Sequence, residues 1–431
     1  MATTNTVTET IRTTARRSLI LTLCATLIAG LLSVFLGASA SAATTPTYLG
    51  TLSTKPEQAQ TESNAGIKIA MVELSWAKYE TAPGVFDKNY ENIIKWRVNS
   101  LKAAGMKITL GLGLHYTPQW IKDLPNGKFI AQDGTVSSEA NVVFNQTIRT
   151  YAEEYFARAD TALRFEDFWS VRVNSGARSE VMFPSGGKYW AFDTNAQNGP
   201  AKPPTMAANP LPGWKPGTTG KTQAQVTSWL NWYVGALADV ARWQATAVRN
   251  LGFTGYIEVL TPGTGVLNYQ IPALTAANLP NGNLGIGVAW GILYSKMVGI
   301  PNVVAHVTSV ADGSKSNAGC TTADRSVPLD SSATTKFSAT AWISRIADEY
   351  GFGKSGENPG LPGTTDPRRA FYLDPSSTGM MAVAVGQARS CGFKSFYWAH
   401  DDQFWNGLLK LSTYAGYSTT GGAVPPNAPT S

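Results

Sequence analysis

Residues 67–114 read IKIAMVELSWAKYETAPGVFDKNYENIIKWRVNSLKAAGMKITLGLGL. Two short apolar runs, 67–74 and 107–114, stand at its ends, and residues 90–105 between them carry apolar side chains at the three-to-four spacing of a helix. Short bounded apolar runs are typical of buried strands, and the helical spacing is typical of an amphipathic helix. A strand, a helix and a second strand in this order predict one β–α–β unit with parallel strands.

The same alternation continues along the 431-residue chain. We expect six more strands, with the weakest pattern at 350–356, and they lie at 47–52, 168–173, 254–260, 302–310, 350–356 and 394–400. Helical spacing recurs at 145–163 and at 225–252, where a Trp-rich face is typical of core packing. Eight strands with helices between them predict an α/β fold of the (β/α)8 type, the TIM barrel.

A long insertion is expected after the fourth strand. Residues 184–222 are rich in Pro, Gly and Asn and are too long for an ordinary connecting loop. Barrels place their chemistry on the loops that follow the carboxyl ends of the strands. We therefore expect this insertion to form a wall of the functional site.

The N-terminus has the pattern of a secretory signal peptide. Three arginines precede the apolar run 18–37, and the small residues ASASA follow at 38–42. We expect residues 1–42 to be removed near Ala42 and the protein to be secreted, with an uncleaved membrane anchor as the alternative. The barrel domain should then occupy 43–415, and residues 416–431 resemble a flexible tail.

Composition excludes several functional classes. The formal net charge is +6 without any block of Lys or Arg, so a nucleic-acid partner is not implied. The three histidines are far apart in the sequence, and no CxxC or HExxH motif is present, so we expect neither a metal nor another cofactor. In an oxidising compartment Cys320 and Cys391 most simply form a disulfide; two free buried thiols are the alternative.

Two carboxylates follow strands on opposite sides of the predicted barrel. Glu180 comes after the fourth strand and Glu357 after the seventh. Glycoside cleavage needs such a pair, because one acid protonates the leaving oxygen while the other attacks the anomeric carbon or activates water. Apolar residues 181–183 favour a protonated Glu180, and donors such as Asn358 favour an ionised Glu357. Ordinary solvated acids are the alternative, and Glu258 is the carboxylate that would replace Glu357.

Aromatic and histidine side chains near strand ends complete the predicted site. Trp398, which ends the last strand, can stack on a sugar ring or plug the barrel. Trp76 and Tyr116 can form sugar subsites or simply pack. His115 can bond a substrate hydroxyl, and His306 can bond the nucleophile or belong to the core.

A family resemblance supports this interpretation. VELSWAKYETAPGVFD (72–87) resembles the second-strand motif of glycoside hydrolase family 42, the β-galactosidase-like members of clan A, and GLGLHYTPQWI (111–121) resembles their third-strand segment. The resemblance implies a retaining β-glycosidase that acts on an oligo- or polysaccharide. It assigns the acid/base to Glu180, the nucleophile to Glu357, and supporting contacts to His115, His306 and Trp398.

The sequence departs from clan A in two places. Ser179 stands where the clan usually has an Asn that bonds the sugar 2-hydroxyl, and the arginine of the clan's second strand is absent. SGARSEVMFPS (175–185) is also similar to the G-x-x-x-E-x-x-[YF]-P-S segment of β-amylases, which are inverting enzymes on α-glucans. An inverting α-glucan hydrolase and a non-catalytic carbohydrate-binding barrel therefore remain alternatives.

Overall fold

The computed structural model describes residues 47–313 and 317–418. The predicted signal peptide, 1–42, and residues 419–431 of the predicted tail lie outside these residues. Within the described part of the chain, no helix combines the length and the apolar character needed to cross a membrane.

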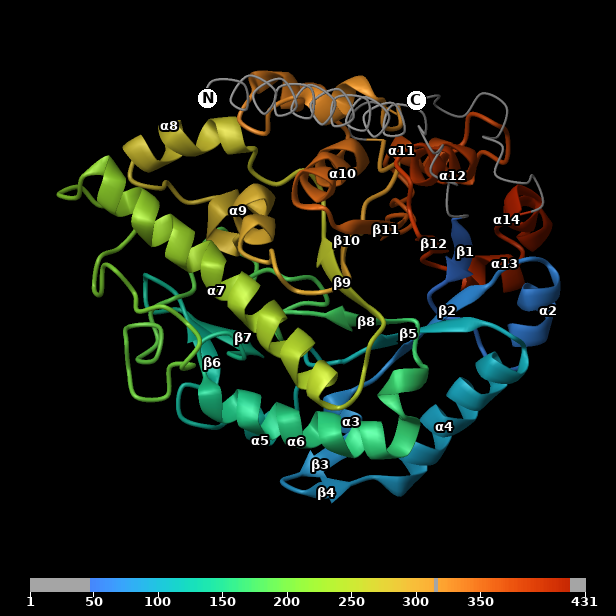
Figure 1. The fold of residues 1–431 in the computed structure, drawn as a ribbon, viewed down its shortest axis with the longest axis horizontal. Helices are drawn as coiled ribbons and strands as arrows, with labels where there is room; N and C mark the ends of the chain where they lie inside the picture. The colour runs from blue at the N-terminus through green and yellow to red at the C-terminus, as the bar shows by residue number, and fades with distance from the viewer. Residues whose placement is uncertain (1–46, 314–316, 419–431) are drawn as a thin grey trace, which may run out of the picture. The chain divides into compact units, whose positions relative to one another are not determined.

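The core is a closed barrel of eight parallel strands, arranged around the ring in chain order (Figure 1). The strands are β1 (Tyr48–Thr51), β2 (Ile69–Glu73), β5 (Lys107–Gly111), β8 (Ser170–Val173), β9 (Tyr256–Thr261), β10 (Val303–Val307), β11 (Gly353–Glu357) and β12 (Ser395–Trp398). Each falls within or beside one of the eight predicted runs. The predicted (β/α)8 barrel is confirmed, including the strand with the weakest pattern.

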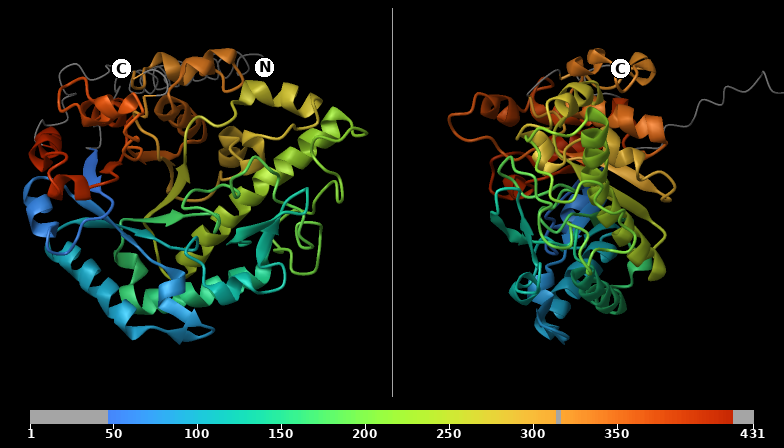
Figure 2. Two further views of the ribbon diagram at one scale, coloured as in Figure 1. Left: turned by 180° about the vertical axis from the view of Figure 1, so that it is seen from behind. Right: turned by 90° about the vertical axis from the view of Figure 1, so that its left-hand side faces the viewer.

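Helices surround the strands in both face-on views (Figure 1 and Figure 2). They are α2 (Ala59–Asn64), α3 (Trp76–Tyr79), α4 (Lys88–Ala103), α5 (Gln119–Lys122), α6 (Gln146–Leu163), α7 (Gln223–Asn250), α8 (Ile271–Ala276), α9 (Trp290–Ser295), α10 (Ala339–Tyr350), α11 (Arg368–Leu373), α12 (Met380–Ser390), α13 (Asp402–Trp405) and α14 (Leu411–Ser418). Two short hairpins, β3 (Glu80–Ala82) with β4 (Val85–Phe86) and β6 (Lys128–Ile130) with β7 (Val136–Ala140), complete the fold.

Local sequence explains where the main helices begin. The side chains of Asp87 and Asn145 accept hydrogen bonds from the first backbone N–H groups of α4 and α6, and Thr222 begins α7 with a capping box. The Trp-rich face of α7 is buried, as its pattern predicted. Helix α14 runs to Ser418, so the expected tail begins three residues too early; 416–418 belong to a helix whose Tyr414 is buried in the domain.

The interior of the barrel contains a network of polar side chains. The hydroxyl of Thr109 lies 2.6 Å from that of Ser170 and 2.5 Å from that of Tyr397. Arg172 and Glu258 lie buried in the same interior and bond each other at 3.2 Å. Buried polar groups persist only when they are partnered, so this network fixes the strand ends on which the site stands.

A disulfide ties the loop after β10 to the end of α12. Cys320 and Cys391 are bonded, which confirms the predicted pairing. The link closes a loop across a sequence separation of 71 residues, from a segment without strand structure to the helix that precedes β12. It anchors a long connection whose described residues include two short turns of 3-10 helix.

Candidate active site

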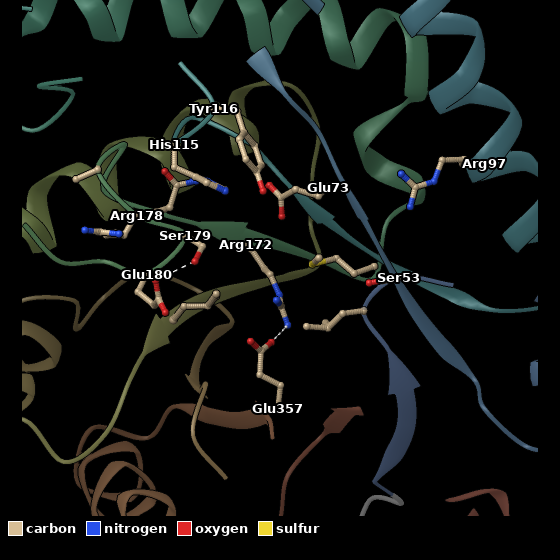
Figure 3. A pocket seen from close by; sticks show the side chains of 15 residues that line it. Ser53, Glu73, Arg97, His115, Tyr116, Arg172, Arg178, Ser179, Glu180 and Glu357 are labelled. Atoms are coloured by element: carbon tan, nitrogen blue, oxygen red, sulfur yellow. Dashed lines mark hydrogen bonds and ion pairs between the residues drawn. The ribbon is translucent and has the colours of Figure 1, made fainter. Parts of the chain in front are cut away.

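A cavity of about 560 Å³ opens at the carboxyl end of the barrel (Figure 3). Its walls come from the ends of β2, β8, β9 and β11 and from the loops after β1, β5 and β8, with one residue from α4. They consist of Leu52, Ser53, Met71, Glu73, Arg97, His115, Tyr116, Arg172, Asn174, Ala177, Arg178, Ser179, Glu180, Leu260 and Glu357. Both predicted catalytic carboxylates, Glu180 and Glu357, therefore line one cavity, where barrels hold their active sites.

Glu357 is the last residue of β11 and is firmly held. Its Oε2 lies 2.8 Å from a guanidinium nitrogen of Arg172 and 3.1 Å from Nε2 of His306. Burial acts to raise the pKa of Glu357, but the charge of Arg172 and the contacts of His306 outweigh it and lower this pKa to about 2. Glu357 is therefore ionised at neutral pH, as a nucleophile requires.

Arg172 is the centre of this network, and the sequence analysis did not identify it. It lies in β8 and bonds Glu258 at 3.2 Å as well as Glu357. Burial alone would lower the pKa of Arg172, but its two carboxylate partners raise it. Clan A was expected to show an arginine on the second strand; here a fourth-strand arginine contacts Glu357. Its signal in the sequence was a single cation inside the apolar run 168–173.

His306 is buried in β10 and supports Glu357 instead of lining the cavity. Its Nδ1 lies 2.8 Å from Oγ of Ser355 and 3.3 Å from Oε2 of Glu258, while Nε2 faces Glu357. The expectation that His306 bonds the predicted nucleophile fits this geometry, but direct sugar contact does not, because the side chain is fully buried. Glu258 is likewise sealed in the interior at 1% exposure, and its pKa is lowered because His306 and Arg172 outweigh burial.

Glu180 stands on a loop and has few partners. Within the described structure, its carboxylate accepts a hydrogen bond from the hydroxyl of Ser179 at 2.8 Å. The backbone of the loop is fixed, because Val181 N donates to the carbonyl of Leu260 and the hydroxyl of Ser175 donates to the carbonyl of Met182. The carboxyl group thus projects from a held loop into the cavity beside Ser179 (Figure 3).

His115 and Tyr116, both predicted to contact the substrate, line the cavity on the loop after β5. Burial lowers the pKa of His115 to about 4, so the imidazole is neutral at neutral pH. Tyr116 is 49% exposed, and its ring centroid lies 4.0 Å from that of His115. A neutral imidazole and an exposed phenol ring are groups that can contact sugar hydroxyls and C–H bonds.

Two predicted aromatic subsites are wrong. Trp398 is fully buried on the outer side of β12, where it packs against Tyr372 and Tyr414. Trp76 is also fully buried; its indole N–H donates to Glu80 at 2.7 Å and its ring stacks on Tyr155. Neither ring lines the cavity, because each fills the layer between strands and helices.

Two further expectations about the site also need correction. Asn358 is 1% exposed; its side-chain oxygen accepts from the backbone N–H of Ala399 and its amide donates to Pro359, so it supports a turn instead of the nucleophile. The loop directly after β8 lines the cavity through Asn174 and residues 177–180, whereas no residue of the predicted wall 184–222 lines it.

The cavity also contains two residues that the sequence analysis did not assign to the site. Glu73 ends β2 and Arg97 lies in α4, and both face the cavity (Figure 3). Across residues 47–313 and 317–418, no three His, Cys, Asp or Glu side chains are grouped so as to hold a metal ion. The titratable side chains that line the cavity are carboxyl groups, arginines, one histidine and one tyrosine.

Comparisons with known proteins reveal the same architecture. No protein-family model matches the sequence, and no curated protein matches it significantly. Among solved structures, a β-galactosidase from the psychrophilic Marinomonas ef1 is similar with a TM-score of 0.52 and 13% identity over 82% of this chain. A polyextremophilic β-galactosidase from the Antarctic haloarchaeon Halorubrum lacusprofundi gives 0.51 and 12% over 82%. The chain spans about half of each, 54% and 52%. At this identity the likeness establishes a shared (β/α)8 barrel fold.

Proposed function

We propose that the protein is a glycoside hydrolase that uses Glu357 as nucleophile and Glu180 as acid/base. The observation that carries the proposal is that the two carboxylates, from strands four and seven, line one open cavity at the carboxyl end of the barrel. The sequence resemblance to family 42 and the barrel shared with two β-galactosidases support it. A retaining β-glycosidase resembling the β-galactosidases is the form that these features favour.

Glu180 and Glu357 have different roles in the first step of glycoside cleavage. The carboxylic acid of Glu180 gives its proton to the glycosidic oxygen, while the carboxylate of Glu357 attacks the anomeric carbon, so the alcohol leaves and a glycosyl ester forms. Arg172 and His306 keep Glu357 ionised and fix the orientation of its Oε2. This preorganisation matters because the attacking oxygen must already point at the anomeric carbon.

In the second step Glu180 acts as a base. Its carboxylate takes a proton from water, the water oxygen attacks the anomeric carbon, and the ester bond to Glu357 breaks with the electron pair returning to that carboxylate. Position and access suit Glu180 to both roles, since it stands on a loop at the open cavity and has no cationic partner in the described structure that would hold it permanently ionised.

The test is hydrolysis of aryl glycosides by purified residues 43–431. A panel of β-galactosides, β-glucosides and α-L-arabinosides is measured beside Glu180→Gln and Glu357→Gln. Turnover that is lost in both variants supports the pair and identifies the sugar. Full activity of Glu357→Gln would contradict the assigned nucleophile.

A second candidate is an inverting α-glucan hydrolase. The match of residues 175–185 to the β-amylase segment favours it. In that case Glu357 would activate water directly and the product would have the opposite anomeric configuration. Proton NMR of the first sugar released separates the two, because retention supports the double displacement and inversion supports the second candidate.

We also propose that the protein is secreted. The leader pattern at 1–42 and the bond between Cys320 and Cys391 support this, because disulfides persist in oxidising compartments. The mass of the exported protein tests it: a chain that starts near residue 43 is expected, and a full-length membrane-bound chain would favour the anchor.

A further inference from the structure

A third carboxyl group faces the cavity and has no role in the two-carboxylate mechanism. Glu73, the last residue of β2, lines the cavity together with Glu180 and Glu357 (Figure 3). Its Oε1 is buried without a hydrogen-bond partner. A buried oxygen without a partner costs free energy unless a water, an ion or a ligand bonds it, so this atom at the cavity is a candidate contact for a bound molecule.

The neighbouring strand is built to leave space for this carboxyl group. A Cβ on Gly111 would lie 2.1 Å from Oε2 of Glu73, so any larger residue there would displace the carboxyl. Gly113, in the loop that follows β5, gives Glu73 a backbone hydrogen bond. The position of the group therefore depends on two glycines at the end of β5.

Glu80 provides an internal comparison, because it belongs to the same sequence motif seven residues later. Both of its oxygens are satisfied: Oε2 accepts from the indole of Trp76 at 2.7 Å, and Oε1 accepts from the backbone N–H of Gly84 at 2.9 Å. Glu80 is 1% exposed and lies outside the cavity lining. Glu80 thus has the partners of a structural carboxylate, whereas Glu73 lacks one.

The surroundings also keep Glu73 available as a donor. Burial raises its pKa to about 7, and the charge of Glu357 adds to this effect while Arg172 and Arg97 oppose it. The charged and titratable groups that interact with it are Tyr90 and Arg97 of α4, Tyr116 after β5, Tyr155 of α6, Arg172 of β8 and Glu357 of β11. Near neutral pH the group is therefore present both as an acid that donates and as a carboxylate that accepts.

We propose that Glu73 is a substrate-binding residue whose carboxyl group hydrogen-bonds a hydroxyl of the sugar ring held between Glu180 and Glu357. The inference rests on the proposed function and deepens it, since it makes one free hydroxyl of that ring a requirement for recognition. A sugar that lacks this hydroxyl leaves the carboxyl unpartnered and is rejected, in the way that polar sites reject deoxy analogues.

The test measures kcat/KM for the aryl glycoside that the wild type cleaves best and for its monodeoxy analogues. We expect one deoxy analogue to be roughly 10-fold to 100-fold worse for the wild type, as expected for a lost hydrogen bond to a charged or buried group. Glu73→Ala should reduce that penalty to within about threefold while leaving the penalties for the other positions in place.

Glu80→Gln is the matched control. It removes a carboxylate of the same motif, so a purely structural effect should change kcat/KM by one common factor for every analogue. If Glu73→Ala behaves like Glu80→Gln, with every deoxy penalty retained, the inference is overturned.

A binding measurement separates this inference from the proposed function. Calorimetry with D-galactose, D-glucose and maltose is run on the wild type, Glu73→Gln and Glu73→Ala. Sugar binding that weakens about tenfold or more in Glu73→Ala supports the inference even where no glycoside is hydrolysed. Binding that is unchanged in Glu73→Ala, or wild-type protein that binds none of the three sugars, would overturn it.

Discussion

The two sides of the cavity hold their carboxylates in different ways. Glu357 ends a barrel strand, and two buried side chains, Arg172 and His306, contact its Oε2 within 3.1 Å. Glu180 lies seven residues beyond the end of its strand, and its carboxylate bonds the hydroxyl of the adjacent Ser179. One side is a fixed charge in the barrel, and the other is a loop acid open to the cavity.

This difference matches the two chemical roles. A nucleophile must be ionised and aimed before the substrate arrives, which the rigid strand network provides. An acid/base must change its protonation state twice in one turnover, which a permanent ion pair with an arginine would oppose. The asymmetry thus supports the roles proposed above for Glu357 and Glu180.

The largest expected effect on kcat comes from substitution of Glu357, the carboxylate fixed on strand β11. Glu357→Gln removes the attacking oxygen anion, and we expect kcat to fall by at least about 10⁴-fold. The folded structure should persist, because the amide can still accept from Arg172. The measurement is kcat on the best aryl glycoside, with circular dichroism to confirm folding. A loss smaller than tenfold would mean that the fixed carboxylate is not the nucleophile.

The loop side should give a smaller and leaving-group-dependent effect. Glu180→Gln removes proton donation, which is worth about 10²–10⁴-fold for a poor leaving group. An activated nitrophenyl group needs little protonation, so its loss in the first step should be much smaller. Comparison of nitrophenyl and unactivated glycosides checks this. An equal loss for both substrates would argue against an acid role for Glu180.

Substitution of Arg172 tests whether the negative charge of Glu357 depends on its arginine partner. Arg172→Met leaves Glu258 and Glu357 buried without their cation, and we expect a loss of about 3–5 kcal/mol in the free energy of unfolding. Because Arg172, together with His306, lowers the pKa of Glu357 to about 2, removal of Arg172 should raise this pKa. The acidic limb of kcat/KM should then move to higher pH.

The depressed pKa of Glu357 also determines how the free energy of unfolding of the wild type depends on pH. A carboxylate with a depressed folded pKa stabilises the protein above its unfolded pKa, and that contribution is lost as pH falls toward 2. Arg172→Met should therefore lose this stabilisation at neutral pH, whereas Arg172→Lys, which retains the charge, should lose less. Urea unfolding at pH 7 measures the difference, and equal losses in both variants would show that packing, not charge, is responsible.

The same contrast between strand and loop explains what the sequence could predict. The eight strands were predicted because apolar runs and helical spacing alternate along the chain, and the barrel topology then placed Glu180 and Glu357 at one opening. The sequence predicted less well whether each strand side chain points into the barrel or towards the helices. In SFYW, residues 395–398, every position is buried, so the pattern does not reveal that Tyr397 faces the interior and Trp398 the helices.

The sequence also could not predict which side chains contact one another between different strands of the barrel. Arg172, Glu258 and His306 come from three different strands, and the folded sheet brings Arg172 and His306 into contact with both Glu258 and Glu357. Glu73 and Glu80 stand in one motif with similar neighbours, but one faces the cavity and the other is enclosed by a hairpin. Such distinctions depend on tertiary contacts far apart in the sequence.

The smallest expected effect concerns Ser179, the one side chain that is hydrogen-bonded to the carboxylate of Glu180 among the described residues. Ser179→Ala removes the hydroxyl that donates to Glu180 at 2.8 Å, an exposed hydrogen bond worth at most about 0.5–1.5 kcal/mol. We therefore expect kcat/KM to change by roughly twofold to tenfold. Ser185→Ala is the matched control, because its hydroxyl bonds Arg178 on the same loop and lies outside the cavity lining. A loss near that of Glu180→Gln would mean that the loop acid is positioned as strictly as Glu357, and the contrast between the two sides would fail.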